Sequence, residues 1–116
     1  MLYIQLVAPN ITQSPQSITA VAGTDINLEC RATGDPIPTV EWLNNNLPIA
    51  PVYETISRPG YGKLLIKDCG TGDSGAYQCR FTNIKASALS NIANVNINGN
   101  STKLMIDELF SILLRK

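Results

Sequence analysis

Alternation of apolar and polar residues with a period of two is the feature that most constrains the fold of this chain. It recurs in five short segments, which are residues 25–32, 39–43, 63–67, 76–82 and 93–98. Such alternation is typical of a β-strand with one buried face and one face in water. No long segment before residue 100 has a helical period, so the sequence predicts an all-β chain.

Turn-forming residues separate these segments. Glycine, proline, asparagine and aspartate concentrate at residues 33–38, 44–46, 58–62 and 70–75. Glycine supplies a positive φ, proline fixes φ, and asparagine and aspartate tolerate the left-handed region. Many short strands joined by such turns predict an antiparallel sandwich or barrel.

Composition excludes most kinds of catalytic chemistry. The 116 residues suffice for about one domain, and the chain contains no histidine. A histidine general base, a Ser-His-Asp or Cys-His nucleophile and a histidine-ligated metal site are therefore excluded. No carboxylate pair is placed for acid–base work and no acidic cluster has calcium-ligand spacing. We expect no enzymatic activity, no cofactor and no small-molecule substrate.

Charge and hydropathy restrict the partners. Nine Lys and Arg residues balance nine Asp and Glu residues, so there is no general attraction to nucleic acid. No apolar run reaches the roughly 18 residues that suggest a membrane span. We expect contact with a membrane only through segments outside this sequence.

Two cysteines, a tryptophan and a tyrosine stand at characteristic positions on the predicted inward faces. Cys30 and Cys79 enclose 48 residues, Trp42 follows Cys30 by twelve residues, and Tyr77 precedes Cys79 by two. With the motifs at residues 34–42 and 73–79, this spacing resembles the immunoglobulin superfamily, and within it the intermediate set, or I-set. The resemblance covers residues 9–98, about four fifths of the chain.

The resemblance implies an immunoglobulin-like Greek-key sandwich of two sheets. One sheet would hold strands near residues 9–13, 24–32, 54–57 and 63–67. The other would hold strands near residues 39–44, 47–53, 76–83 and 90–97, with residues 16–21 pairing onto its edge.

The same resemblance implies one disulfide, Cys30–Cys79, between the sheets, with Trp42 packed on it. Tyr77 would close the corner before the second cysteine, and Leu28, Leu64 and Ile66 would join the core. The alternative is that both cysteines are reduced and only fill space.

Cys69 is left over. We interpret it as a buried small hydrophobic residue and a free thiol. An intermolecular disulfide or a redox-reactive thiol is the alternative. Arg58 and Asp73 are candidates for a salt bridge at the base of the sandwich, and the alternative is two solvated charges.

Two N-x-[ST] triplets, at Asn10 and Asn100, are candidate N-glycosylation sites if the chain is secreted.

Both ends of the chain depart from the family pattern. Residues 1–8 form an N-terminal extension that is apolar but lacks the basic region of a secretory signal. Residues 99–116 form a tail in which apolar residues recur at helical spacing, which predicts an amphipathic helix. Three interpretations of the tail stay open: it docks on the domain or a partner, it begins a further segment, or it is not native sequence.

By resemblance, we expect a non-enzymatic module for protein–protein recognition or cell adhesion. It would belong to a larger extracellular adhesion molecule, receptor or matrix protein. The partner would be a protein, bound homophilically or heterophilically. The candidate contact segments are residues 44–51 and 80–87, and the residues singled out within them are Asn45, Asn46, Arg80, Asn83 and Lys85. The alternative is an intracellular, cytoplasmic spacer of the kind found in titin-like or myosin-light-chain-kinase-like proteins.

Overall fold

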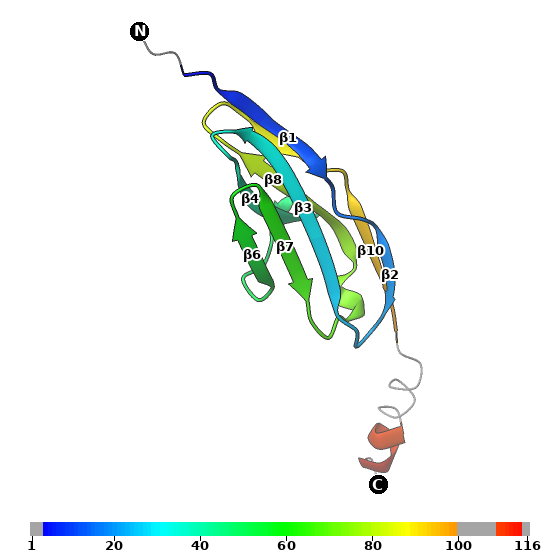
Figure 1. Ribbon diagram of the computed structural model, residues 1–116. Coiled ribbons are helices and arrows are strands. Elements are labelled where there is room, and N and C mark those ends of the chain that lie inside the picture. The colour runs from blue at the N-terminus through cyan, green and yellow to red at the C-terminus, as the bar shows by residue number, and fades with distance from the viewer. Residues whose placement is uncertain (1–3, 100–108, 115–116) are drawn as a thin grey trace.

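Two β-sheets packed face to face make up the body of the computed structural model, which describes residues 4–99 and 109–114 (Figure 1). The first sheet has the strand order β1-β3-β7-β6, and all of its pairs are antiparallel. Its strands are β1 (Val7–Gln13), β3 (Ile26–Asp35), β7 (Tyr61–Ile66) and β6 (Glu54–Arg58).

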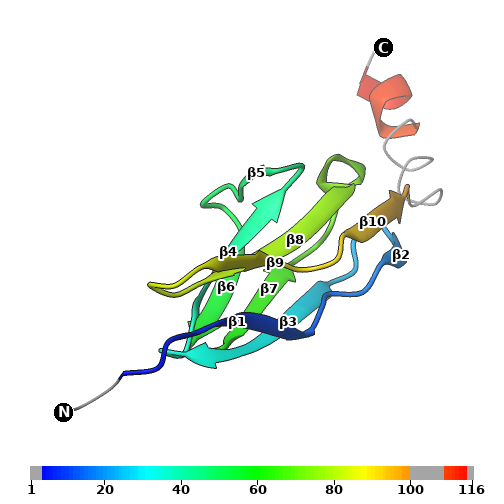
Figure 2. The same ribbon diagram turned by 90° about the horizontal axis from the view of Figure 1, so that it is seen from above.

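The second sheet has the strand order β2-β10-β8-β4-β5, and a further strand, β9, pairs with β8. Its strands are β2 (Ile18–Val21), β10 (Ala93–Asn98), β8 (Gly75–Thr82), β4 (Thr39–Asn44), β5 (Leu47–Pro48) and β9 (Ser87–Leu89). Figure 2 shows the two layers from above. The predicted sheet membership is confirmed, including the pairing of the early segment onto the edge of the second sheet.

The chain changes sheets between β1 and β2. β1 pairs with β3 in the first sheet, whereas β2 runs parallel to β10 in the second. Buried Pro15 lies at the crossover, where its missing N–H removes no ladder bond. The backbone amides of Asn91 and Asn94 donate to the hydroxyls of Ser14 and Ser17, at 3.1 and 2.9 Å. The crossover is therefore anchored to the second sheet on both sides of the proline.

The core lies between the sheets and consists of the predicted inward residues. Leu64, Tyr77, Cys30 and Cys79 have no exposed surface, and Trp42 is 2% exposed. The other predicted members, Leu28 and Ile66, are also buried. Because every second residue of β3, β7, β8 and β10 points into this core, the period-two pattern is explained directly.

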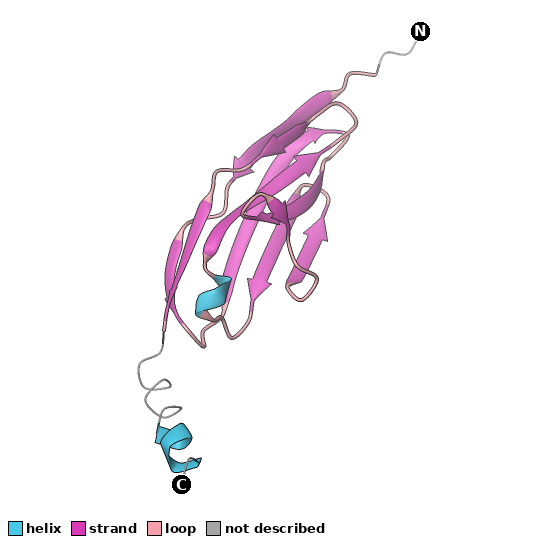
Figure 3. Cartoon of the chain, turned by 180° about the vertical axis from the view of Figure 1, so that it is seen from behind, coloured by secondary structure: helices cyan, strands magenta, loops and turns pink. Residues whose placement is uncertain are grey.

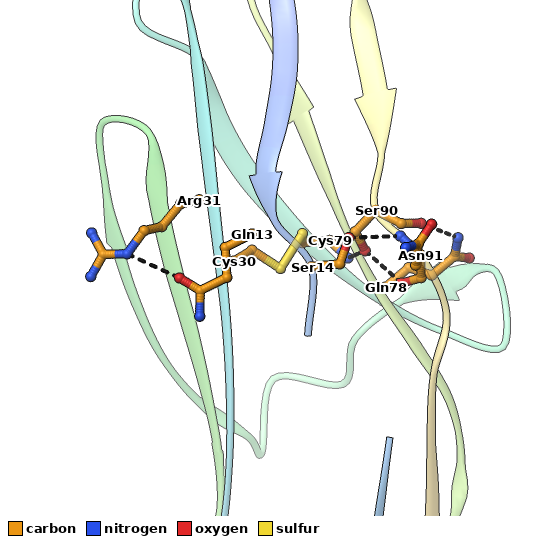
Figure 4. The surroundings of a disulfide bond; sticks show 8 residues. All are labelled: Gln13, Ser14, Cys30, Arg31, Gln78, Cys79, Ser90 and Asn91. Carbon is orange, nitrogen blue, oxygen red and sulfur yellow. Dashed lines mark hydrogen bonds between the residues drawn. A yellow bond between two sulfur atoms is a disulfide. The ribbon is translucent and has the colours of Figure 1, made fainter. Parts of the chain in front are cut away.

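The predicted disulfide is present and joins β3 to β8 across the core (Figure 4). In the chain-entropy account, a crosslink that closes a loop of this length stabilises the fold by about 4 kcal/mol.

Ser90 lies beside Cys79 and is the one buried polar residue among those that the structure describes. Its hydroxyl accepts from the Cys79 amide and donates to the Asn91 carbonyl, and its own amide donates to the Cys79 carbonyl.

Several strand boundaries differ from the sequence prediction. The strand expected near 47–53 stops at Pro48, since residues 50–53 turn back toward β6. The strand expected near 90–97 begins only at Ala93, as β10, and the short strand β9 ends before it at Leu89, because the Ser90 hydroxyl takes up the amide of Cys79 where a backbone carbonyl would be expected. β1 begins at Val7 rather than at residue 9.

A 3-10 helix, η1 (Thr71–Asp73), precedes β8 and carries the tyrosine corner (Figure 3). The Tyr77 hydroxyl donates to the backbone carbonyl of Asp73 at 2.6 Å. The Tyr53 hydroxyl donates to the Asp73 carboxylate, whose other oxygen accepts from the Gly70 amide. Burial, followed by the hydrogen bond to Asp73, raises the pKa of Tyr53 well above its ordinary value, and burial raises the pKa of Tyr77.

The C-terminal helix covers residues 109–114 of the described chain. Its five large apolar side chains are all more than half exposed, namely Leu109, Phe110, Ile112, Leu113 and Leu114. This helix therefore does not bury its apolar residues against the sandwich. The rest of the predicted helical segment, residues 101–108 and 115–116, lies outside the described residues.

Candidate recognition surface

Two loops lie next to each other at the end of the sandwich where β1 begins (Figures 1 and 2). One connects β3 to β4 and contains Pro36 and Ile37, and the other connects β8 to β9 and contains Asn83 and Ile84. Between them lies a groove of about 420 Å³, lined by Pro36, Ile37, Thr39, Thr82, Asn83 and Ile84. We call these six residues the apolar pole.

Asn83 fixes the geometry of the pole. Its amide nitrogen donates to the carbonyl of Val7 at 2.7 Å and to the carbonyl of Pro36 at 3.0 Å. Its side-chain oxygen accepts from the amides of Lys85 and Ala86. One side chain thus connects β1 and both loops, which holds the loops in a single arrangement.

Two large apolar side chains project from these loops. Ile37 is 62% exposed and Ile84 is 78% exposed. Ile84 lies inside the predicted contact segment 80–87 but is not among the residues singled out within it, and sequence reasoning missed Ile37, although it is an apolar residue inside the turn segment 33–38. Exposed apolar groups beside a concave surface on fixed loops are typical of a protein-contact site.

The predicted contact residues do not form one surface. β4 and β8 pair along their lengths, with Thr39 opposite Thr82 and Asn44 opposite Tyr77. Asn83 and Lys85 therefore lie at one end of this sheet, and Asn45 and Asn46 lie at the other. Whether either group contacts a partner stays a prediction.

Four of the five predicted contact residues make contacts inside the domain. Arg80 forms an ion pair with Glu41 at 2.7 Å, and Lys85 Nζ donates to the Leu6 carbonyl at 3.1 Å. The side-chain oxygen of Asn45 accepts from the Ala76 amide, and Asn83 is used as described above. Asn45 and Asn46 both have a positive φ, at 51° and 67°, so they build the turn between β4 and β5.

The predicted salt bridge between Arg58 and Asp73 is absent. Among the described residues, the ion pairs are Lys67–Glu54 and Arg80–Glu41. Asp73 lies near Tyr53 and Glu54, at the start of β6, whereas Arg58 is the last residue of that strand. About 13 Å of extended chain separates the two ends of β6, since a strand rises about 3.3 Å per residue. Asp73 instead binds Tyr53 and Gly70.

Cys69 is a free cysteine and only 2% exposed, as the sequence predicts for a small hydrophobic residue. Its thiol donates to the Val21 carbonyl at 3.5 Å and lies 3.7 Å from the Thr24 hydroxyl. This burial favours a packing role over an intermolecular disulfide.

Of the two candidate glycosylation sites, Asn10 is among the described residues and Asn100 is not. Asn10 lies on β1 with its side chain exposed, and its modification stays a prediction.

In residues 4–99 and 109–114, no group of three or more Cys, Asp or Glu side chains is arranged to hold a metal ion. No helix in the same part of the chain is long and apolar enough to cross a membrane.

Comparison with known proteins identifies the family. A family model described as an immunoglobulin domain matches residues 8–83. The chain belongs to the immunoglobulin superfamily. Proteins of this family are usually non-enzymatic and mediate protein–protein interactions. Its assignment to the I-set stays a prediction.

Relatives of this immunoglobulin domain include adhesion-type proteins. It is 39% identical to mouse hemicentin-2 over 72 residues, which is 62% of this chain and 1% of that protein. It is 39% identical to hemolin of Lonomia obliqua over 77 residues, 66% of this chain and 18% of hemolin. A sidekick homolog of Caenorhabditis briggsae is 38% identical over 96 residues, 78% of this chain and 4% of that protein. The chain thus spans a small part of these relatives.

Solved immunoglobulin domains have the same fold. Titin domain M7 has a TM-score of 0.76 at 26% identity, covering 83% of this chain and 99% of that structure. The tandem immunoglobulin repeats of Dlar have a TM-score of 0.70 at 26% identity, covering 79% of this chain and 49% of that structure. The similar structures therefore include a titin domain as well as the tandem immunoglobulin repeats of Dlar.

Proposed function

We propose that this domain is a protein-recognition module of a larger extracellular adhesion-type protein, and that the apolar pole is its contact surface. The observation that carries the proposal is the pair of exposed isoleucines, Ile37 and Ile84, on loops held by Asn83.

Preorganisation supports this choice of surface. A contact loop that is already held in one conformation loses little entropy when a partner binds. Large apolar groups near the centre of an interface contribute most to binding when they become fully buried. A stable interface buries about 1,200–2,000 Å² in total, so we expect the pole to form its centre and the neighbouring polar residues to form its rim.

The relatives support an extracellular role. Hemicentin-2, hemolin and the sidekick proteins are among the sequences most similar to this chain. The alternative, an intracellular spacer, has support from the similar titin domains. A spacer does not require exposed apolar groups around a fixed groove, and we therefore prefer recognition.

The proposal is tested with beads that each carry many copies of the full chain. Beads coated with the protein report homophilic binding by clustering, and binding of the beads to cells of the source organism reports a heterophilic partner. We expect one of these signals with the unmodified protein and its loss with Ile84→Asp.

Val52→Asp is the matched control, because Val52 is 83% exposed and lies near Asp73, away from the pole. Equal loss of binding in both variants would contradict the assignment of the pole, as would unchanged binding with Ile84→Asp.

A further inference from the structure

We propose that the outer face of the first sheet binds a sulfated polysaccharide through a row of side chains formed by Arg31, Tyr61 and Arg58. This surface is separate from the apolar pole and does not depend on the function proposed above.

Strand register brings the three residues together. Arg31 of β3 pairs with Tyr61 of β7, and Tyr61 pairs with Arg58 of β6. Neighbouring strands lie about 4.8 Å apart, so the two arginines start from backbone positions about 10 Å apart with the tyrosine between them. The row runs across the strands. Arg31 and Tyr61 point away from the core because their neighbours Cys30 and Gly62 are buried, and Arg58 lies on the same face because it pairs with Tyr61.

Both guanidinium groups lie close to the tyrosine ring. The Cζ atom of Arg31 is 4.7 Å from the Tyr61 ring centroid, and that of Arg58 is 5.9 Å from it. Arg31 is also held from the other side, since its Nε donates to the Gln13 side chain at 3.1 Å (Figure 4). The row is therefore partly ordered before a ligand arrives, which lowers the entropy cost of binding.

The charges on this face are not neutralised by ion pairs. Elsewhere among the described residues, Lys67 and Arg80 pair with carboxylates and Lys85 donates to a backbone carbonyl. Within residues 4–99 and 109–114, the cations that remain are Arg31, Arg58 and Lys63. Lys63 lies on the same face, two residues along β7 from Tyr61.

Glu29 is the carboxylate nearest to this group in the strand register, where it stands opposite Lys63 without forming an ion pair. The three cations Arg31, Arg58 and Lys63 outnumber the one nearby carboxylate, that of Glu29. This face therefore has a local excess of positive charge, although the net charge of the whole chain is zero.

The chemistry of the row favours sulfate groups on a linear chain. A guanidinium presents a planar set of N–H donors that matches a tetrahedral oxyanion. The terminal nitrogens of both arginines have no hydrogen-bond partner within the described chain. Because the row is open and extends across three strands, it suits an extended ligand with repeated anionic groups.

Other polyanions fit less well. Single-stranded nucleic acid gains affinity by stacking bases on exposed aromatic faces, but Tyr61 is already flanked by two guanidinium groups. A basic residue at an anionic membrane contributes only about 1 kcal/mol of binding free energy. Three such residues would therefore not hold the protein stably on a membrane.

Binding of the full chain to an immobilised heparin dodecasaccharide tests the proposal. We expect log K to fall with log[NaCl] with a slope of about −2, since Lys63 lies on the same face as Arg31 and Arg58 and each of the three cations contributes about 0.7. Arg58→Gln and Arg31→Gln should each weaken binding about fivefold to tenfold and lower that slope by about 0.7. Both side chains are exposed, so these variants remain folded.

Lys67→Gln is the matched control, because it removes the same charge from a residue that is already paired with Glu54. It should leave heparin affinity within about twofold of the unmodified protein. Equal loss in Lys67→Gln and Arg58→Gln would overturn the proposal, because binding would then follow net charge alone.

Three further outcomes would also overturn it. They are undiminished binding to desulfated heparin, tighter binding to phosphatidylserine vesicles, and tighter binding to a single-stranded oligonucleotide of matched length.

Discussion

The side-chain amide of Asn83 donates to the carbonyl oxygen of Val7 at 2.7 Å, although 76 residues separate them in the sequence. The same amide nitrogen reaches Pro36, so one residue connects the first strand to both loops of the apolar pole. Loops fixed in this way can present Ile37 and Ile84 to a partner without rearranging.

Asn83→Ala should destabilise the domain by about 2–3 kcal/mol. The substitution removes two donated and two accepted hydrogen bonds, each with a net value of about 1 kcal/mol, and part of the loss is recovered by water because the site is partly exposed. Urea unfolding measures the change. Asn94→Ala, at an exposed position of β10, is the control and should shift the free energy of unfolding by less than about 0.5 kcal/mol. A loss no larger than that of the control would contradict the role of Asn83.

Gly60→Ala should cost about 2 kcal/mol or more. Gly60 has a φ of +73°, and a Cβ built on it would lie 2.8 Å from the Ala32 carbonyl oxygen. Gly72→Ala is the matched control, because a Cβ there meets no heavy atom within 4 Å. The two variants are compared by thermal unfolding, and equal midpoints would show that the turn at Gly60 relaxes at no cost.

Stability should fall as the pH rises above about 10. Burial and the Asp73 carboxylate raise the pKa of Tyr53 in the folded state, so the unfolded chain, with a tyrosine pKa of about 10, releases this proton first. The stabilisation is complete below pH 10 and is lost as the pH rises toward the folded-state pKa. Tyr77 acts in the same direction.

Tyr53→Phe removes one of these groups, and the decline in unfolding free energy between pH 9 and pH 11 should become shallower. An unchanged slope, measured by urea unfolding at each pH, would exclude Tyr53 as a source of the effect.

Replacing both Cys30 and Cys79 by alanine should lower the free energy of unfolding by about 4 kcal/mol or more. The crosslink accounts for about 4 kcal/mol, and the two buried side chains add packing losses. Guanidinium unfolding of the double variant measures this. Cys69→Ala serves as the control, with a smaller expected loss of about 1 kcal/mol because one buried thiol is removed. A double variant as stable as the control would contradict the account.

Much of the fold could be predicted from local sequence pattern. Alternation in residues 25–32 and 76–82 identified the inward faces, and Cys30 and Cys79 lie on those faces because side chains alternate across a strand. The change of sheet between residues 9–13 and 16–21 is expected from the resemblance to the immunoglobulin family alone, and Pro15 is compatible with it because both segments form edge strands.

The candidate sites could not be predicted to the same extent, because they depend on register and on long-range hydrogen bonds. Whether Arg58 lies beside Tyr61 or near Asp73 depends on the direction and length of β6, which composition does not reveal. The late start of the last strand, after Ser90, depends on one hydroxyl meeting the Cys79 amide. Asn83 looks like an ordinary turn residue until three distant segments converge on it.

Counting thiols on protein from its natural source tests the central claim most directly. The claim is that this domain is a disulfide-linked recognition module of extracellular type. After alkylation under denaturing, non-reducing conditions and peptide mapping, we predict one reactive thiol among the three cysteines of this domain, that of Cys69, which is buried in the folded state. Three reactive thiols would mean that Cys30 and Cys79 are reduced in the organism, and that result would contradict the extracellular account in favour of an intracellular spacer.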